Sequence, residues 1–409
     1  MRRSLILILL FVFIDVLGFS LILPLLPYYA ADFNASSIMV GLLLSANALT
    51  QMIGAPILGR LSDRFGRKPL LVSSIIGTVI SFLVLGFANS LALLFLSRIL
   101  DGLLGGNFSL AQAYITDTTT RDERAAGLGL IGAAFGVGFI FGPALGGFLS
   151  AGGSYALPAF AAAGLGALNL VGVLIWLPES LPPEKRSTEK GKTLPRVSLG
   201  ALLDALRRPC VGPLLSVVLI YGLAFTIFQT MFSLFTQQKL GFTAQATSYV
   251  LTYVGVLVVL VQGGGIRWLS KKFSDKQLIF SGAVLLTGGL LGWAFSNSLA
   301  SLLIALAPLA LASGMLRVST NSALTKSVQS SEVGGILGLS ASFNSFTAVI
   351  APLIGSFLLA QISPAAPGVL GAILMVGAVL LTWTRILTVP DLDCENMSDD
   401  QTDIDRSIT

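Results

Sequence analysis

Apolar segments of about 20 residues recur along the chain, and shorter polar stretches separate them. A helix that crosses a bilayer needs about 20 predominantly apolar residues. Twelve segments meet that requirement: residues 4–29, 38–59, 69–89, 91–115, 125–150 and 157–177 in the first half, and residues 212–237, 246–267, 277–296, 299–325, 333–360 and 366–388 in the second. The pattern therefore predicts an all-α membrane protein with twelve transmembrane helices.

The spacing of these segments predicts two helical domains. We expect an N-terminal six-helix bundle over residues 1–177 and a C-terminal six-helix bundle over residues 212–388. Residues 178–211 form a Pro-rich, charged linker, in which "SLGALLDALRR" is expected to be a short amphipathic helix at the membrane surface. Residues 389–409 are acidic and are predicted to be disordered.

Two sequence matches at nearly the same spacing relate the halves. "LSDRFGRKPL" (61–70) aligns with "LSKKFSDKQL" (269–278), and "FGPALGGFL" (141–149) aligns with "IAPLIGSFL" (350–358). Each pair joins equivalent spans with the same sidedness, which indicates a parallel repeat of six helices about an axis along the membrane normal. Repeats of this kind place a substrate site between the halves near the middle of the membrane.

Composition supports a membrane environment. The chain of 409 residues is 54% hydrophobic and 11% charged, with a mean hydropathy of +0.86, whereas soluble domains carry about 25% charged residues. It contains no histidine, which excludes histidine zinc sites, Ser-His triads and histidine proton relays. We therefore expect no enzyme activity, no metal and no cofactor.

The positions of the 25 Lys and Arg residues predict the orientation. With the N-terminus inside, Lys239 alone falls in an outer loop, Arg98 and Arg317 fall within spans, and all the others lie on the cytoplasmic side. Cytoplasmic loops carry an excess of Lys and Arg. The pattern therefore predicts a multi-pass protein of the inner or plasma membrane with both termini in the cytoplasm.

The most specific polar motif is "GRLSDRFGRKPLL" (59–71), a short connection with five charged residues between two spans. These charges have to stay at the cytoplasmic surface, so one interpretation is a topology anchor. The basic residues could in addition pair with an acid on a neighbouring helix, for which Asp117 is the natural partner. The cytoplasmic gate predicted on this basis comprises Gly59, Asp63, Gly66, Arg67, Lys68 and Asp117.

Predicted spans one and four hold three charged residues well inside their ends. A rise of 1.5 Å per residue puts Asp15 about 16 Å from the inner edge and Asp101 about 15 Å from the outer edge, with Arg98 about 10 Å below that edge. Intramembrane charges are costly and usually paired or functional, and a partly dry site makes the neutral form of a carboxyl group accessible near physiological pH. Asp15, Arg98 and Asp101 are thus candidates for proton coupling. Alternatively, Arg98 and Asp101 form a structural pair, and Asp15 has a helix-packing role.

Three motifs together resemble the major facilitator superfamily, and the resemblance covers about residues 4–388. Gly59, Leu61, Asp63, Gly66, Arg67 and Lys68 match its loop signature, and Arg98 with Gly102 is similar to its fourth-span motif. The sequence has Asp101 where a Gln is common. The residues that resemble the antiporter motif of the twelve-span drug:proton branch are Gly138, Gly142, Pro143, Gly146 and Gly147.

With Asp15, Gly18 and Pro24 in the first span, the motifs look most like those of tetracycline-resistance-like antiporters. The resemblance implies the major facilitator fold, with spans one, four, seven and ten lining a cavity. Phenylalanines on span seven would suit a flat amphiphilic molecule in that cavity, or they pack against lipid and other helices, and Arg317 would line the cavity or snorkel to the cytoplasm. The substrate-binding candidates are Asn47, Gln51, Asn107, Gln112, Phe225, Gln229, Phe232 and Arg317.

We therefore expect a proton-coupled antiporter that exports a small amphiphilic compound by alternating access. Its partners would be that compound, protons and the lipid bilayer, without nucleic acid, and it would act as a monomer. One alternative is a proton-coupled uptake symporter for a sugar or organic acid on the same fold, since fold does not decide substrate. Another is a non-transporting membrane receptor or scaffold, which would not need charges in the middle of the membrane.

Overall fold

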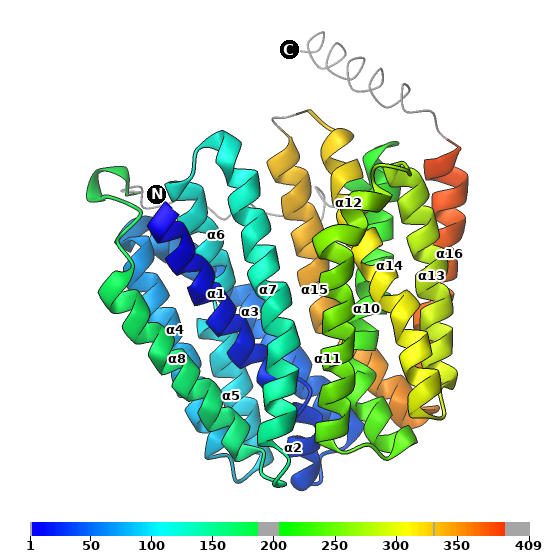
Figure 1. Cartoon of the computed structure of the whole chain (residues 1–409), viewed down its shortest axis with the longest axis horizontal. Helices are drawn as coiled ribbons and strands as arrows, with labels where there is room; N and C mark the ends of the chain where they lie inside the picture. The colour runs from blue at the N-terminus through cyan, green and yellow to red at the C-terminus, as the bar shows by residue number, and fades with distance from the viewer. Residues whose placement is uncertain (1, 187–203, 330–331, 389–409) are drawn as a thin grey trace. The chain divides into compact units, whose positions relative to one another are not determined.

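The computed structural model describes residues 2–186, 204–329 and 332–388, and no strand occurs within them (Figure 1). The helices of the first half are α1 (Arg2–Ile22), α2 (Leu26–Asp32), α3 (Ser37–Phe65), α4 (Arg67–Gly86), α5 (Leu91–Leu104), α6 (Asn107–Thr118), α7 (Arg121–Leu149) and α8 (Ala156–Trp176). A short 3-10 turn, η1 (Pro183–Lys185), follows them.

The helices of the second half are α10 (Val211–Leu240), α11 (Ala244–Leu260), α12 (Ile266–Leu269), α13 (Asp275–Phe295), α14 (Leu299–Lys326), α15 (Val333–Gln361) and α16 (Ala366–Leu381). Two π-helical segments extend them, η2 (Val261–Gly265) after α11 and η3 (Thr382–Leu387) after α16. Most of the predicted amphipathic helix and all of the predicted acidic tail lie outside the described residues.

Eleven helical segments in the described part of the chain are long and apolar enough to cross a membrane. The predicted span 246–267 is the exception, because its α-helix ends at Leu260 and continues as the π-turn η2. That turn has the sequence VQGGG, and successive glycines weaken an α-helix because they lose the most conformational freedom on folding.

The chain divides into two compact units, which we describe separately. One unit holds Met1–Lys190, Thr230–Val259 and Pro352–Pro364, and the other holds Gly191–Gln229, Leu260–Ala351 and Ala365–Thr409. The first unit thus contains the whole predicted N-terminal bundle together with two segments of the second half. The predicted domain boundaries at residues 177 and 212 stay a prediction.

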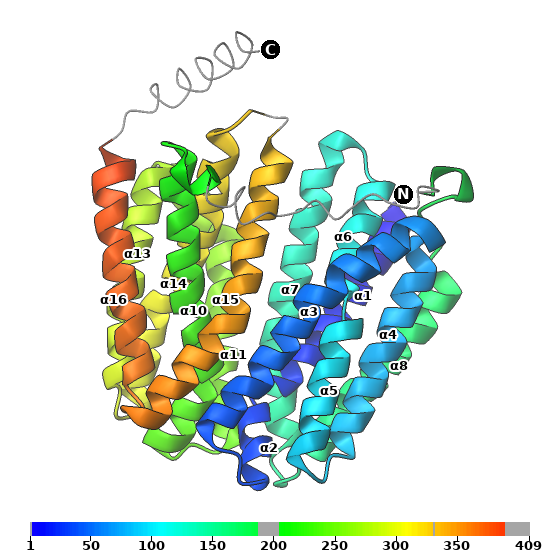
Figure 2. The ribbon, with the colours of Figure 1, turned by 180° about the vertical axis from the view of Figure 1, so that it is seen from behind.

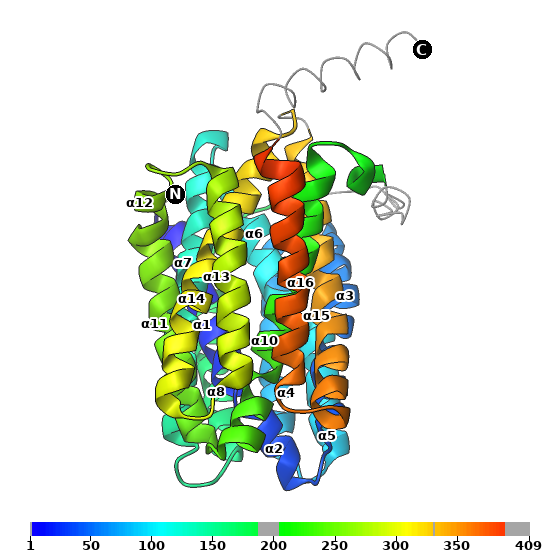
Figure 3. The same ribbon diagram turned by 90° about the vertical axis from the view of Figure 1, so that its right-hand side faces the viewer.

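Helix pairs form the core of each unit. In the first unit α1 packs against α7 and α8, while α4 packs against α5 and α8, and α3 against α5 (Figures 1 and 2). In the second unit α13 packs against α14 and α16 (Figure 3). Trp293 of α13 is fully buried in this second group.

Two predicted spans are broken near their ends or middle. Span one ends as α1 at Ile22 and resumes as α2 at Leu26, across Pro24, which lacks the N–H that a continuous helix requires. Span four breaks between α5 and α6 at Gly105 and Gly106. Gly105 N donates to Asp101 O at 2.7 Å, and a side chain at Gly106 would collide with Leu58. The two breaks thus fall at a proline and at a pair of glycines.

A stripe of glycines brings α7 against α1. A Cβ atom at Gly138 would crowd Val16, one at Gly142 would overlap Ser20 and the backbone of Leu21, and one at Gly146 would overlap the Leu21 carbonyl. Ser20 Oγ donates across this contact to the Gly138 carbonyl at 3.0 Å. The three glycines are four residues apart, as close helix packing in membranes requires.

Replacing Gly142 with Ala should destabilise the protein by about 1–3 kcal/mol, since the new methyl group meets backbone that cannot move aside. Gly132→Ala on the same helix is the matched control, because a Cβ there meets nothing within 4 Å. It should leave stability unchanged or raise it, since Ala favours helix over Gly. Thermal unfolding of both variants in detergent provides the measurement, and equal transition temperatures would contradict the packing role of Gly142.

Candidate functional site

Asp15, on α1, meets the start of α6. Asn107 Nδ2 donates to Asp15 Oδ1 at 2.6 Å and to Thr78 Oγ1 at 3.2 Å. Asn107 is the first residue of α6, directly after the break in span four, and only 3% of it is exposed. The N-terminal end of a helix carries partial positive charge, so the ionised form of Asp15 is stabilised by both the amide and the helix.

Arg98 and Asp101, on α5, form a buried ion pair. Arg98 Nη1 lies 3.4 Å from Asp101 Oδ2, and the two residues are 3% and 8% exposed. The rest of the guanidinium group contacts Ser97 Oγ and Ser81 Oγ, at 3.3 and 3.4 Å, and lies over the Phe82 ring. The structure therefore brings together the two residues that the sequence predicted could pair.

Asn47, on α3, hydrogen-bonds both residues of this ion pair. Its Nδ2 donates to Asp101 Oδ2 at 3.1 Å and to the Arg98 carbonyl at 3.0 Å. Gly102 allows α3 and α5 to approach this closely, because a Cβ atom there would overlap Thr50 Oγ1 and the Asn47 carbonyl. The Asp101 carboxylate thus has a cationic and an amide partner, whereas Asn107 donates to Asp15 as a neutral amide.

Of the other predicted polar candidates, Gln51 lies beside the Gly105–Gly106 break and Gln112 lies away from it. Gln51 Nε2 lies 3.5 Å from the Gly105 carbonyl, and Gln112 is exposed on α6. Asn47 and Asn107, predicted as substrate contacts, hydrogen-bond the two carboxylates, and their role in substrate binding stays a prediction. Within the described part of the chain, no group of three His, Cys, Asp or Glu side chains could hold a metal ion.

The predicted candidates on α10 and α14 fall in different surroundings. Phe225 is half-buried and stacks on Tyr221 with ring centroids 5.6 Å apart, and the neighbouring Phe228 packs edge-on against Trp293. Gln229 is exposed, and Phe232 is fully buried in the part of α10 that belongs to the first unit. Arg317 is exposed on α14. A substrate role for these residues stays a prediction.

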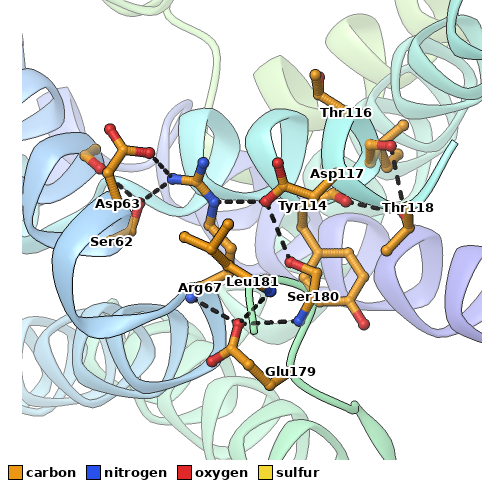
Figure 4. A network of polar contacts seen from close by, with 12 residues as sticks. Ser62, Asp63, Arg67, Tyr114, Thr116, Asp117, Thr118, Glu179, Ser180 and Leu181 are labelled. Atoms are coloured by element: carbon orange, nitrogen blue, oxygen red, sulfur yellow. Dashed lines mark hydrogen bonds and ion pairs between the residues drawn. The ribbon is translucent and has the colours of Figure 1, made fainter. Parts of the chain in front are cut away.

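Arg67 lies at the centre of a second polar network, at the start of α4 (Figure 4). Its Nε lies 2.8 Å from Asp117 Oδ2, and its Nη1 lies 2.6 Å from Asp63 Oδ1 and donates to Ser62 Oγ. Arg67 is 8% exposed. Of the basic residues in the loop, Arg67 therefore takes Asp117 as its partner, while Arg64 lies over the Phe65 ring.

Glu179, which follows α8, completes this network although the sequence assigned it only to the linker. One carboxylate oxygen accepts from Arg67 N at 2.9 Å (Figure 4). The other accepts from Lys68 N at 3.2 Å. Those are the first two residues of α4, so Glu179 satisfies otherwise unpaired N–H groups at a helix start. The side chain of Lys68 donates to the Leu174 carbonyl at 2.9 Å. An acid directly after span six was the available signal for this contact.

Gly66 fits the network through both its conformation and its size. Its φ of 105° lies in a region that residues with side chains rarely adopt, and a Cβ atom would crowd the Glu179 carboxylate. By contrast, a Cβ at Gly59 meets nothing within 4 Å. Of the two predicted glycines, Gly66 alone is thus required by the local geometry.

A third polar cluster lies at the α2 end of the first unit. Tyr28, on α2, lies 2.6 Å from Thr247 Oγ1, 3.5 Å from Thr236 Oγ1, and donates to the Phe242 carbonyl at 3.1 Å. Thr236 and Thr247 contact each other at 2.8 Å. These hydrogen bonds join the first half of the sequence to the second within one unit.

Gly147 of the predicted antiporter motif contacts the residue that follows Thr247 of this cluster. A Cβ atom at Gly147 would crowd Ser248 of α11, whereas Gly138, Gly142 and Gly146 face α1. Pro143 lies inside α7, which continues through it as one helix. The motif therefore packs one helix against two neighbours, one from each half of the sequence.

Comparison with known proteins identifies the family of this chain. The family model described as Major Facilitator Superfamily matches residues 8–293 and 266–400. Tetracycline resistance protein, class C, of Escherichia coli is 32% identical over 364 residues, which cover 86% of this chain and 89% of that protein. Multidrug resistance protein 2 of Bacillus subtilis (strain 168) is 28% identical over 350 residues, covering 85% and 86%.

Solved structures agree on the fold. The human organic anion transporter MFSD10 (TETRAN) superposes with a TM-score of 0.69 at 22% identity, covering 93% of this chain and 99% of that one. The nucleoside transporter NupG superposes with a TM-score of 0.74 at 14% identity, covering 94% and 99%. The predicted all-α major facilitator fold is confirmed. The chain belongs to the major facilitator superfamily, and it is a multi-pass membrane transporter of small molecules rather than an enzyme.

Proposed function

We propose that the protein exports a small amphiphilic compound in exchange for protons, by alternating access, across the cell membrane with both termini in the cytoplasm. The relatives named for tetracycline and multidrug resistance support the export of such compounds. The observation that carries the coupling is the Asp15 carboxyl group, held inside a transmembrane helix by the neutral amide of Asn107.

Of the two intramembrane carboxylates, Asp15 is the better proton carrier. Protonating Asp101 would leave the buried Arg98 cation without its counter-ion, and an unpaired buried charge is costly. Protonating Asp15 leaves a neutral acid beside a neutral amide. We therefore assign proton exchange to Asp15. Arg98 and Asp101 have a structural role, in which they hold α5 against α3 and α4.

The electrostatic link between the two sites supports coupling. The Asp15 and Asp101 carboxylates repel each other, so a change at one alters the free energy of ionising the other. Asp101 lies in the last turn of α5, before the Gly105–Gly106 break, and Asn107, which hydrogen-bonds Asp15, is the first residue after it. A substrate cation or hydrogen-bond donor near this break would favour the ionised form of Asp15, which is what exchange of substrate for a proton requires.

Replacing Asp15 with Asn should reduce transport driven by a pH gradient to the level of vesicles without the protein, while the protein still folds. The measurement is accumulation of tetracycline or ethidium in inverted membrane vesicles whose lumen is made acidic. The antiporter accumulates the compound in the lumen and loses it when the gradient is collapsed. An uptake symporter would instead deplete the lumen, and a receptor or scaffold would do neither.

The Arg67 network supports a role at the cytoplasmic end. Asp63, Arg67, Asp117 and Glu179 fix the loop between α3 and α4 to α6 and to the end of α8. All four belong to the first half of the sequence, so the network makes that half rigid at its cytoplasmic end. We propose that this network holds the inner gate in a defined position while the two halves move.

Replacing Arg67 with Lys should lower the transport rate about tenfold, equivalent to roughly 1.4 kcal/mol, because a lysine cannot contact Asp63, Asp117 and Ser62 together. Arg64→Lys is the matched control in the same loop, since Arg64 is exposed and lies over the Phe65 ring. Initial rates in the vesicle assay, normalised to the amount of folded protein, test this. Equal rates for the two variants would exclude the gate role of Arg67.

A further inference from the structure

The side chain of Asn107 is only partly satisfied. Both hydrogens of its Nδ2 are used, one on Asp15 Oδ1 at 2.6 Å and one on Thr78 Oγ1 at 3.2 Å. Its Oδ1 atom is buried and has no hydrogen-bond partner among the described residues. Buried polar atoms without a partner are rare in native proteins, and each one calls for a physical reason.

The ionised state of Asp15 supplies that reason. A carboxylate can only accept hydrogen bonds, so it holds the NH₂ end of the amide toward itself and turns Oδ1 away. When a proton binds Asp15 Oδ1, the oxygen that accepts from Nδ2, the resulting hydroxyl group becomes a donor and faces the NH₂ group, which is also a donor. A half-turn of the amide plane exchanges the two ends in almost the same volume and lets Oδ1 accept from Asp15.

Thr78 is compatible with both arrangements. Its hydroxyl group accepts from Asn107 Nδ2 in the structure, and a hydroxyl group can equally donate to an amide oxygen. The network of Asp15, Asn107 and Thr78 therefore has two hydrogen-bonded arrangements, one for each protonation state of Asp15.

We propose that Asn107 is the positioning residue that sets the protonation equilibrium of Asp15 and transmits its state, by a half-turn of its amide, to the break in the fourth span. This inference rests on the proposed function in requiring Asp15 to exchange a proton. It replaces the role in substrate contact that the sequence suggested for Asn107. Asn107 is the first residue of α6 and follows Gly105 and Gly106, so its amide lies directly beside the break.

Other charges near Asp15 are few in the elements packed against α1. Asp101 on α5 interacts with it electrostatically, and Asp101 is paired with Arg98. The charged residues of α7 occupy only its first turn, residues 121–124, and the sequence of α8 contains no charged residue. Asp117 and Tyr114 of α6 bond to Arg67 and to the Pro178 carbonyl. The Asn107 amide is thus the group best placed to control Asp15.

Infrared titration of the purified full-length protein tests this without any substrate. The carbonyl stretch of a protonated carboxylic acid is followed against pH, and the Asp15 band is assigned by its loss in Asp15→Asn. In Asn107→Leu, the pH at which half of Asp15 is protonated should rise by about one unit, because the hydrogen bond to the ionised form is lost. The band should also change frequency, since the protonated acid loses its acceptor.

A matched control shows whether the shift in the Asp15 titration is specific to Asn107 or follows from removing any buried amide side chain. Asn169 on α8 is also buried and donates to α1, through Nδ2 to the Phe11 carbonyl at 3.1 Å. Asn169→Leu should leave the Asp15 titration and band frequency unchanged. Asn107→Ser, whose side chain is too short to reach Asp15, should reproduce the Asn107→Leu shift and replaces that variant if it does not fold.

The outcomes distinguish this inference from the proposed function. If no band that depends on Asp15 titrates in the native protein, proton exchange at Asp15 is wrong. If the band titrates but keeps its midpoint and frequency in both Asn107 variants, the role of Asn107 is wrong and proton exchange at Asp15 stands. A shift in Asn169→Leu as large as that in Asn107→Leu would also overturn the inference.

Discussion

The cost of placing an ionised side chain among apolar helices is the constraint on which the first unit depends. The three charges well inside α1 and α5 are each met by a partner from another helix or from one turn away: Arg98 by Asp101, Asp101 by Asn47, and Asp15 by Asn107. These contacts fix which faces of α1, α3, α5 and α6 meet. The helices can approach closely enough to make them because glycines remove side chains from the same interfaces, as at Gly102 and Gly142.

The cost of an unpaired buried charge also links the structure to the proposed mechanism. A carboxylate held by a cation stays ionised, whereas one held by an amide can be neutralised without leaving an unpaired charge. Asp101, in the last turn of α5, is held by Arg98, and Asp15 is held by Asn107 at the start of α6, on the other side of the Gly105–Gly106 break. The polar clusters around Arg67 and Tyr28 lie at the two ends of the first unit. The Tyr28 cluster joins the two halves of the sequence within this unit.

Hydropathy predicted the spans well because apolar length is a property of each segment alone. It did not predict the breaks at Pro24 and Gly105, which depend on backbone hydrogen bonding that hydropathy does not register. It also did not give the partners of Asn47, Asn107 and Glu179, since those partners lie on other helices. The pairing of Arg98 with Asp101 was predictable because residues three apart share a helix face. A partner on another helix depends on how the helices rotate against each other, which one sequence does not give.

The central claim is that substrate and proton compete through Asp15, and proton release on substrate binding tests it most directly. Tetracycline or ethidium is added to the purified protein in weakly buffered detergent solution, and the pH change is followed with an indicator dye. The account predicts that binding releases protons from the native protein, near the pH at which Asp15 is half protonated, and none from Asp15→Asn. Binding without proton release from the native protein, or equal release from both proteins, would contradict it.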